Sequence, residues 1–107
     1  MTSTDTELLE LCAAWRQAVD RFIPIADRLA GMLDRDWSAA DRVLNKEVEG
    51  EVFGLERRIF DTEAATLAGL KAKAGVLDYM DTAMGVSPNS EYAASLVTDI
   101  VALGAAW

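Results

Sequence analysis

A seam of large apolar residues repeats every three to four positions through the first third of the chain. Its members are Leu8, Leu11, Trp15, Ala18, Phe22, Ile25, Leu29 and Met32. Because this spacing places side chains on one side of an α-helix, the pattern predicts a long helix with one buried face. A helix of this kind indicates a bundle and carries no information about chemistry.

The first helix is predicted to begin at Thr4, whose hydroxyl can cap the amide of Glu7, and to run to about Leu33. Pro24 lies inside this range and removes one backbone hydrogen bond, which costs roughly 3 kcal/mol in a regular helix. The apolar spacing continues unchanged beyond Pro24. We therefore expect one kinked helix rather than two separate helices.

The second helix is predicted to begin after Ser38, because Asp41 stands three residues later as a capping partner. It contains Gly50 and Gly54, which are one helical turn apart. Glycine weakens a helix unless another element packs closely on it. The two glycines therefore predict a close approach by a neighbouring helix.

The hydrophobic phase resets at Thr62, which is predicted to start a third helix that stops near Gly85. Residues 85–90 are rich in turn formers, and Pro88 or the residues just after it are expected to open the last helix. Apolar positions in that helix are Tyr92, Leu96, Ile100 and Leu103. No segment alternates as a half-buried strand does. The pattern predicts one all-α domain over 1–107, an up-and-down bundle of three long helices plus a shorter C-terminal helix.

Residues 66–74 read T-L-A-G-L-K-A-K-A. Together with the apolar stretch at 8–12 and the closing segment at 95–100, they resemble a set of small uncharacterised bacterial helical proteins that share T-L-A-G-L-x-A-K-A. Glu63 departs from those relatives, which often carry proline at the first helical position. The resemblance implies an all-helical fold of this length, and it implies no activity, cofactor or catalytic residue.

Charge and cysteine content narrow the functional classes. The chain has 18 acidic and 10 basic residues, a formal charge of −8, which repels nucleic-acid phosphates and anionic lipid. Its single cysteine, Cys12, excludes an intramolecular disulfide and is expected to pack at the edge of the core. The first residues lack the features of a signal peptide, and the apolar stretch 92–107 is too short to span a membrane and contains Asp99. We expect a cytoplasmic protein with no nucleic-acid or membrane partner.

The chain contains no histidine, which excludes Ser-His-Asp and Cys-His catalysis and histidine-ligated zinc or di-iron sites. No cofactor is predicted. One enzyme hypothesis stays open: in an antiparallel hairpin of the second and third helices, Glu47, Glu51, Asp78 and Asp81 could converge. Four carboxylates in this arrangement could hold Mg²⁺ against a polyphosphate, as in helical nucleotide pyrophosphohydrolases. The alternative is that these carboxylates are ordinary surface charges.

The competing hypothesis is a non-enzymatic interaction or regulatory module. The same hairpin would bring four basic residues, Arg57, Arg58, Lys71 and Lys73, to one tip, where they could receive an acidic protein. The last helix is apolar over much of its circumference, and Trp107 follows it in the sequence. Because monomers rarely expose large apolar patches, we expect a homodimer with Trp107 and the last helix near its interface.

Overall fold

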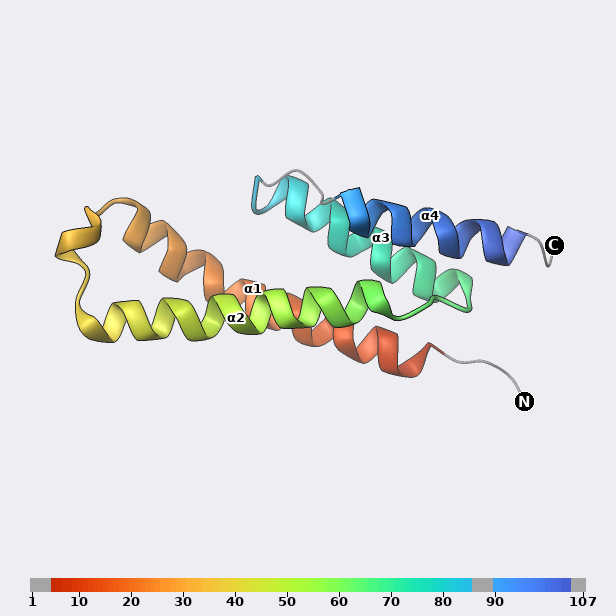
Figure 1. Ribbon diagram of the computed structural model, residues 1–107, viewed down its shortest axis with the longest axis horizontal. Coiled ribbons are helices and arrows are strands. Elements are labelled where there is room, and N and C mark those ends of the chain that lie inside the picture. The colour runs from red at the N-terminus through yellow and green to blue at the C-terminus, as the bar shows by residue number, and fades with distance from the viewer. Residues whose placement is uncertain (1–4, 86–89, 105–107) are drawn as a thin grey trace.

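The computed structural model of the protein describes residues 5–85 and 90–104, with Asp34 described by its backbone alone. Over these residues the chain forms four α-helices and no strand. The helices are α1 (Thr6–Ala30), α2 (Ala39–Asp61), α3 (Leu67–Thr82) and α4 (Ser90–Gly104), with a short 3-10 helix, η1 (Asp34–Asp36), between the first two. They run alternately up and down (Figure 1). The predicted all-α up-and-down bundle is confirmed, with helices of 25, 23, 16 and 15 residues.

The two long helices make the frame of the molecule. α1 and α2 pack along each other, α3 packs on α1, and α4 packs on α3 and α2. Because α3 and α4 are shorter, they cover one part of the α1–α2 pair, and the rest projects as an arm without a third helix (Figure 1). The molecule measures 56 × 25 × 17 Å. Its radius of gyration is 16.1 Å, against about 13 Å for a compact domain of this length.

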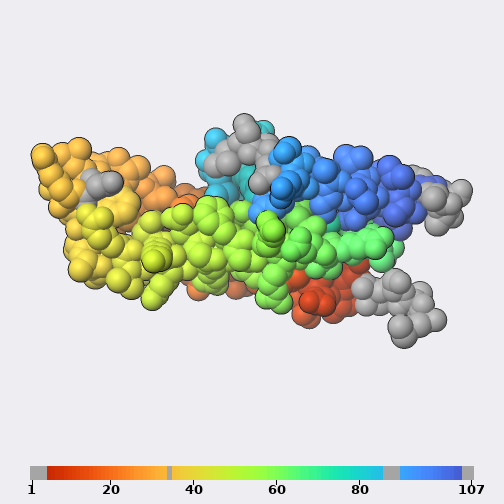
Figure 2. Space-filling model, in the orientation of Figure 1, coloured from red at the N-terminus to blue at the C-terminus, as the bar shows by residue number. Residues whose placement is uncertain are grey.

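The core lies where all four helices are present. Its buried members are Leu8, Leu11, Trp15, Ala18, Val19, Val52, Ile59, Phe60, Ala64, Leu70, Val76 and Met80. Hydrophobic side chains of the arm are less well covered. Leu29 and Val48 are buried there, whereas Leu33 and Val43 are each 57% exposed. The bundle therefore has a packed body and a thinner arm, which Figure 2 shows as a narrower end of the molecule.

The limits of α1 differ from the prediction at both ends. The helix begins at Thr6 with Asp5 at its N-cap, and Asp5 makes no side-chain bond to its own helix. The predicted cap Thr4 lies outside the described residues, and the helix ends at Ala30 rather than near Leu33. Pro24 lies within one uninterrupted helix, so the predicted continuity is confirmed.

The start of α2 is confirmed, and it belongs to a well-bonded turn at the tip of the arm. Ser38 Oγ accepts a hydrogen bond from the Asp41 N–H at 3.0 Å, and the Ser38 N–H donates to Asp41 Oδ2 at 3.4 Å. Arg28 binds the other oxygen of Asp41 at 2.7 Å. Half-buried Trp37 donates from Nε1 to the Leu29 carbonyl at 3.3 Å. These bonds close the connection between the two long helices.

The predicted start of the third helix is wrong. Thr62 ends α2 in an extended conformation, and its hydroxyl donates to the Arg58 carbonyl at 2.6 Å. α3 begins five residues later, after Thr66, whose Oγ1 accepts from the Gly69 N–H at 3.1 Å. It ends at Thr82, three residues before Gly85, which has the expected positive φ of 66°. Pro88 lies outside the described residues.

Gly50 and Gly54 do not bring another helix of this chain into close contact. A side chain at either position would meet no heavy atom within 4 Å, and both residues are exposed. The predicted close approach is therefore wrong within one chain. Among the described helices, none is both long and apolar enough to cross a membrane.

Candidate functional site

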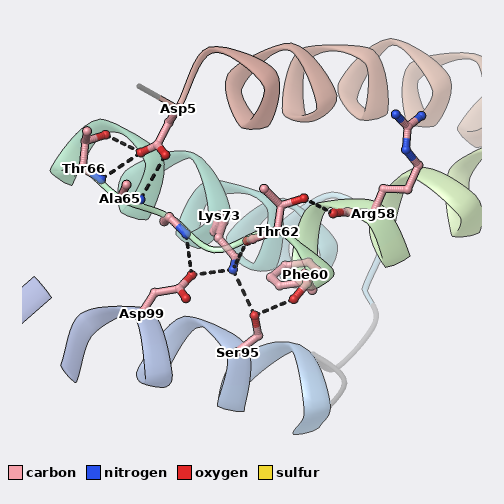
Figure 3. A network of polar contacts seen from close by, with 10 residues as sticks. Asp5, Arg58, Phe60, Thr62, Ala65, Thr66, Lys73, Ser95 and Asp99 are labelled. Carbon is pink, nitrogen blue, oxygen red and sulfur yellow. Dashed lines mark hydrogen bonds and ion pairs between the residues drawn. The ribbon is translucent and has the colours of Figure 1, made fainter. Parts of the chain in front are cut away.

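Lys73, on α3, has a completely buried side chain, which is unusual for a lysine. Its ammonium group donates to Asp99 Oδ2 at 2.5 Å, to the Thr62 carbonyl at 2.9 Å and to Ser95 Oγ at 2.9 Å (Figure 3). An ammonium group has three protons, and each of them has an acceptor here. Burial of this charge is thus fully compensated by neighbouring groups.

The acceptors of Lys73 are themselves bonded to other parts of the fold. Asp99, which is 4% exposed, also accepts from the Ala64 N–H at 3.1 Å. Ser95 Oγ donates to the Phe60 carbonyl at 2.7 Å, and the Phe60 ring stacks on Tyr92 with centroids 4.4 Å apart. The end of α2, the 62–66 connection, α3 and α4 therefore meet in one polar network, which we call the Lys73 network.

A serine beside a lysine suggests a nucleophile and its base, and the geometry argues against that chemistry. A lysine that activates serine must be neutral and accept the hydroxyl proton. Here Lys73 donates to Ser95 and forms an ion pair with Asp99, while the Ser95 proton points to the Phe60 carbonyl. The groups satisfy one another's hydrogen bonds, so the Lys73 network holds the end of α2, α3 and α4 together.

A second buried carboxylate joins the beginning of the chain to α3. Asp5 is 7% exposed and accepts hydrogen bonds from the Ala65 N–H at 3.0 Å, the Thr66 N–H at 2.9 Å and the Thr66 hydroxyl (Figure 3). Burial raises the pKa of Asp5, but hydrogen bonds from Thr66, Ala65 and Gly69 outweigh it and hold the pKa below its ordinary value. A Cβ atom on Gly69 would lie 2.0 Å from Asp5 Oδ2, so the carboxylate occupies the space that a side chain would fill.

The third buried acid, Glu56 on α2, is bonded to a core tryptophan. Trp15 Nε1 donates to Glu56 Oε1 at 3.1 Å, and Glu56 is 5% exposed. Burial raises the pKa of Glu56 above its ordinary value, and the bond from Trp15 opposes this shift only in part. Burial also raises the pKa of Tyr92, and the negative charge of Glu56 adds to that rise.

The carboxylates proposed as a magnesium site do not form a metal-binding group. Glu47 and Glu51 of α2 line a groove of about 470 Å³ along α1, where Glu51 binds Arg21 at 2.5 Å. Asp78 and Asp81 are exposed on α3, which packs on α1 and not principally on α2. In the described part of the chain, no group of three or more histidine, cysteine, aspartate or glutamate side chains could hold a metal ion. The predicted convergence is wrong for these residues.

The predicted basic surface is also different from the observed one. Lys73 is buried in its network and is not available to a partner, so its assignment to the surface is wrong. Arg57, Arg58 and Lys71 are exposed, and Arg57 lies 3.6 Å from Asp61. The Arg58 side chain points away from the Lys73 network (Figure 3). Trp107, the remaining predicted contact, lies outside the described residues.

One exposed apolar surface is the side of α4 that faces away from the bundle. It presents large aliphatic side chains: Val97 is 57%, Ile100 43% and Val101 66% exposed. The charged residues of α4 are Glu91 at its first turn and Asp99, which is buried against Lys73. We call the exposed residues Ala94, Val97, Val101 and Gly104 the outer face of α4.

Sequence reasoning missed the three buried acids and Ser95. A signal existed for Asp99, because a single aspartate inside an otherwise apolar helix calls for a buried partner. No comparable signal marks Asp5 or Glu56, which stand among other polar residues. Their burial depends on contacts with residues about 40 to 60 positions away along the chain.

Comparisons with protein-family models, with curated proteins and with solved structures found no match to this chain. The family resemblance suggested by residues 66–74 therefore stays a prediction.

Proposed function

We propose that this protein is a non-enzymatic interaction or regulatory module and that its first partner is a second copy of itself, in the cytoplasm. The observation that carries the proposal is the outer face of α4, where large aliphatic side chains are exposed and no charge lies among them. A helix that is apolar on all sides is normally buried on all sides. The outer face of α4 has no cover from the described part of the chain, which favours cover by another molecule.

The size of the surface supports association. The chain exposes 6806 Å², whereas a folded monomer of 11.6 kDa is expected to expose about 5,800 Å². An elongated two-layer molecule with an excess of this size is well suited to bind a partner.

The charges of the chain disfavour an acidic partner at the predicted basic surface. Within the predicted basic surface, Arg57, Arg58 and Lys71 are the exposed cations, since Lys73 is buried. Asp61 lies beside Arg57 and reduces the positive charge there. The remaining positive surface is small on a chain of charge −8, so long-range attraction of an acidic protein is weak.

Light scattering on the purified chain tests the proposal directly. At about 50 µM, a Kd near 10 µM would leave most of the protein dimeric, and the mean mass would approach twice 11.6 kDa. Dilution by about tenfold should lower the mean mass, because a mainly apolar interface of modest size dissociates reversibly. A constant monomer mass over this range would contradict self-association.

The enzyme alternative, a magnesium-dependent pyrophosphohydrolase, has its own test. A native-state Mg²⁺ site stabilises the fold by about 2.7 kcal/mol when the cation is a hundredfold above its Kd. We expect MgCl₂ and NaCl of equal ionic strength to give the same melting curve, for wild type and for Glu47→Gln combined with Asp78→Asn. A shift of several degrees that is specific to Mg²⁺ and lost in the double variant would favour the hydrolase.

A further inference from the structure

We propose that two copies of this chain pair through the outer face of α4 as antiparallel helices, with a two-fold axis level with Asp99. This inference rests on the proposed self-association and adds the surface, the direction and the register of the contact. In the single chain the outer face of α4 is exposed, and the proposed partner that covers it is the same helix of a second copy.

Four of the exposed residues of α4 have the spacing of a helix-pairing seam. Ala94, Val97, Val101 and Gly104 follow one another at intervals of three, four and three residues, and all four are exposed. Intervals of three and four keep side chains in line when two helices pack along each other. Asp99 lies on the opposite side of α4, where it binds Lys73. The seam therefore points directly away from the body of the molecule.

The seam reads the same in both directions by size: small, large, large, small. In an antiparallel pair centred at residue 99, Val97 of one copy faces Val101 of the other, and Ala94 faces Gly104. The two valine pairs meet near the axis, while alanine and glycine at the ends let the backbones approach. A two-fold contact requires such self-complementarity, because the same patch serves both partners.

Charge favours a second copy in this orientation. Each copy carries −8, so most of its surface repels another copy. The outer face of α4 has no charged residue, and the central Asp99 is turned inward to its ion pair. A parallel pair would place the two Glu91 residues side by side at one end, whereas an antiparallel pair separates them by the length of the helix.

Charge-introducing substitutions at matched positions test the surface. Val97 on α4 and Val43 on the arm are both valines, both on helices and both 57% exposed. We expect Val97→Glu and Val101→Glu to raise the dimer Kd by at least about tenfold, because each change occurs twice and places a carboxylate against aliphatic side chains. Val43→Glu should leave the Kd within about twofold. Circular dichroism and thermal melting of each variant check that the helices remain folded.

Cysteine cross-linking tests the direction. In a Cys12→Ala background, Val97→Cys and Val101→Cys chains are oxidised alone and as a mixture. An antiparallel pair brings position 97 opposite 101, so the mixture should give a 97–101 cross-link while each chain alone gives little. A parallel pair would give cross-links within each separate sample and few mixed ones.

The outcomes separate the two proposals. A wild type that is monomeric at every concentration overturns both the self-association and the α4 pairing. A wild-type dimer that persists unchanged in Val97→Glu and Val101→Glu overturns the α4 pairing and leaves self-association through another surface. A third outcome is a dimer that is lost in both α4 variants, persists in Val43→Glu and gives only the cross-links of a parallel pair. This outcome would support the outer face of α4 as the interface and overturn the antiparallel register.

Discussion

Replacing Gly69 with alanine tests whether Asp5 binds the N-terminal end of α1 to the start of α3. A Cβ at residue 69 would lie 2.0 Å from Asp5 Oδ2 and 2.6 Å from its Cγ, distances that no packed structure tolerates. The carboxylate must therefore leave its place and release the N–H groups of Ala65 and Thr66. Gly75, on the same helix, has no heavy atom within 4 Å of the corresponding Cβ and serves as the matched control.

The two substitutions should act in opposite directions. At Gly75, alanine should stabilise the fold by about 1 kcal/mol, because alanine favours the helix over glycine by about that amount. At Gly69 the same gain is opposed by the loss of charge-assisted hydrogen bonds, each worth about 1.5 to 3 kcal/mol, with water replacing part of the loss. We expect a net destabilisation of about 2 kcal/mol. The difference between the variants is then about 3 kcal/mol, or about 12 °C in melting temperature at about 4 °C per kcal/mol.

Thermal and urea unfolding followed by circular dichroism measure both variants, and a double-mutant cycle assigns the cause. An Asp5→Ala background removes the two closest atoms, Oδ2 and Cγ, and leaves the Cβ of residue 5 at 3.2 Å, so Gly69→Ala should lose most of its destabilising effect there. A Gly69→Ala protein that melts as high as the Gly75→Ala protein would refute the reasoning. A loss at Gly69 that persists in the Asp5→Ala background would assign the effect to another contact.

Three further perturbations probe the buried polar groups and α1. Lys73→Met should lower the free energy of unfolding in urea by about 3 to 5 kcal/mol, because it leaves Asp99 buried without its cation. Adding Asp99→Leu should recover most of this loss. A double variant that is no more stable than Lys73→Met would contradict this prediction. Because burial raises the pKa of Glu56, its stabilising contribution is complete below about pH 4 and is lost as pH rises through the folded-state pKa. Glu56→Gln should therefore exceed wild type in unfolding free energy at neutral pH and approach it in acid, and a gap that widens in acid would be inconsistent with a raised pKa. Pro24→Ala should raise the melting temperature, since it restores a hydrogen bond inside a continuous helix and the gain is at most about 3 kcal/mol; a lower value would mean that the rigidity of proline outweighs the bond.

Local sequence signals were sufficient for the presence of four helices and for some of their limits. The apolar spacing predicted that α1 continues across Pro24, and the Ser38 and Asp41 pair predicted the start of α2, because periodicity and capping depend on residues within one or two turns of each other. The same kind of signal failed at Thr62. Its hydroxyl had an acceptor in the preceding helix, at Arg58, as well as a possible role in the following one.

Tertiary structure alone decided which polar residues are buried and which apolar residues are not. In the sequence, Lys73 is one basic residue among several, and its burial depends on Asp99 and Ser95, more than twenty residues later. Asp5 accepts a hydrogen bond from the N–H of Ala65, which lies 60 residues later in the connection between α2 and α3. Large apolar residues stand on both the outer and the inner side of α4, and only the packing of α4 on α2 and α3 left Val97 and Val101 exposed. Periodicity tells which residues share a side of a helix, but the side that meets the rest of the chain is chosen by long-range contacts.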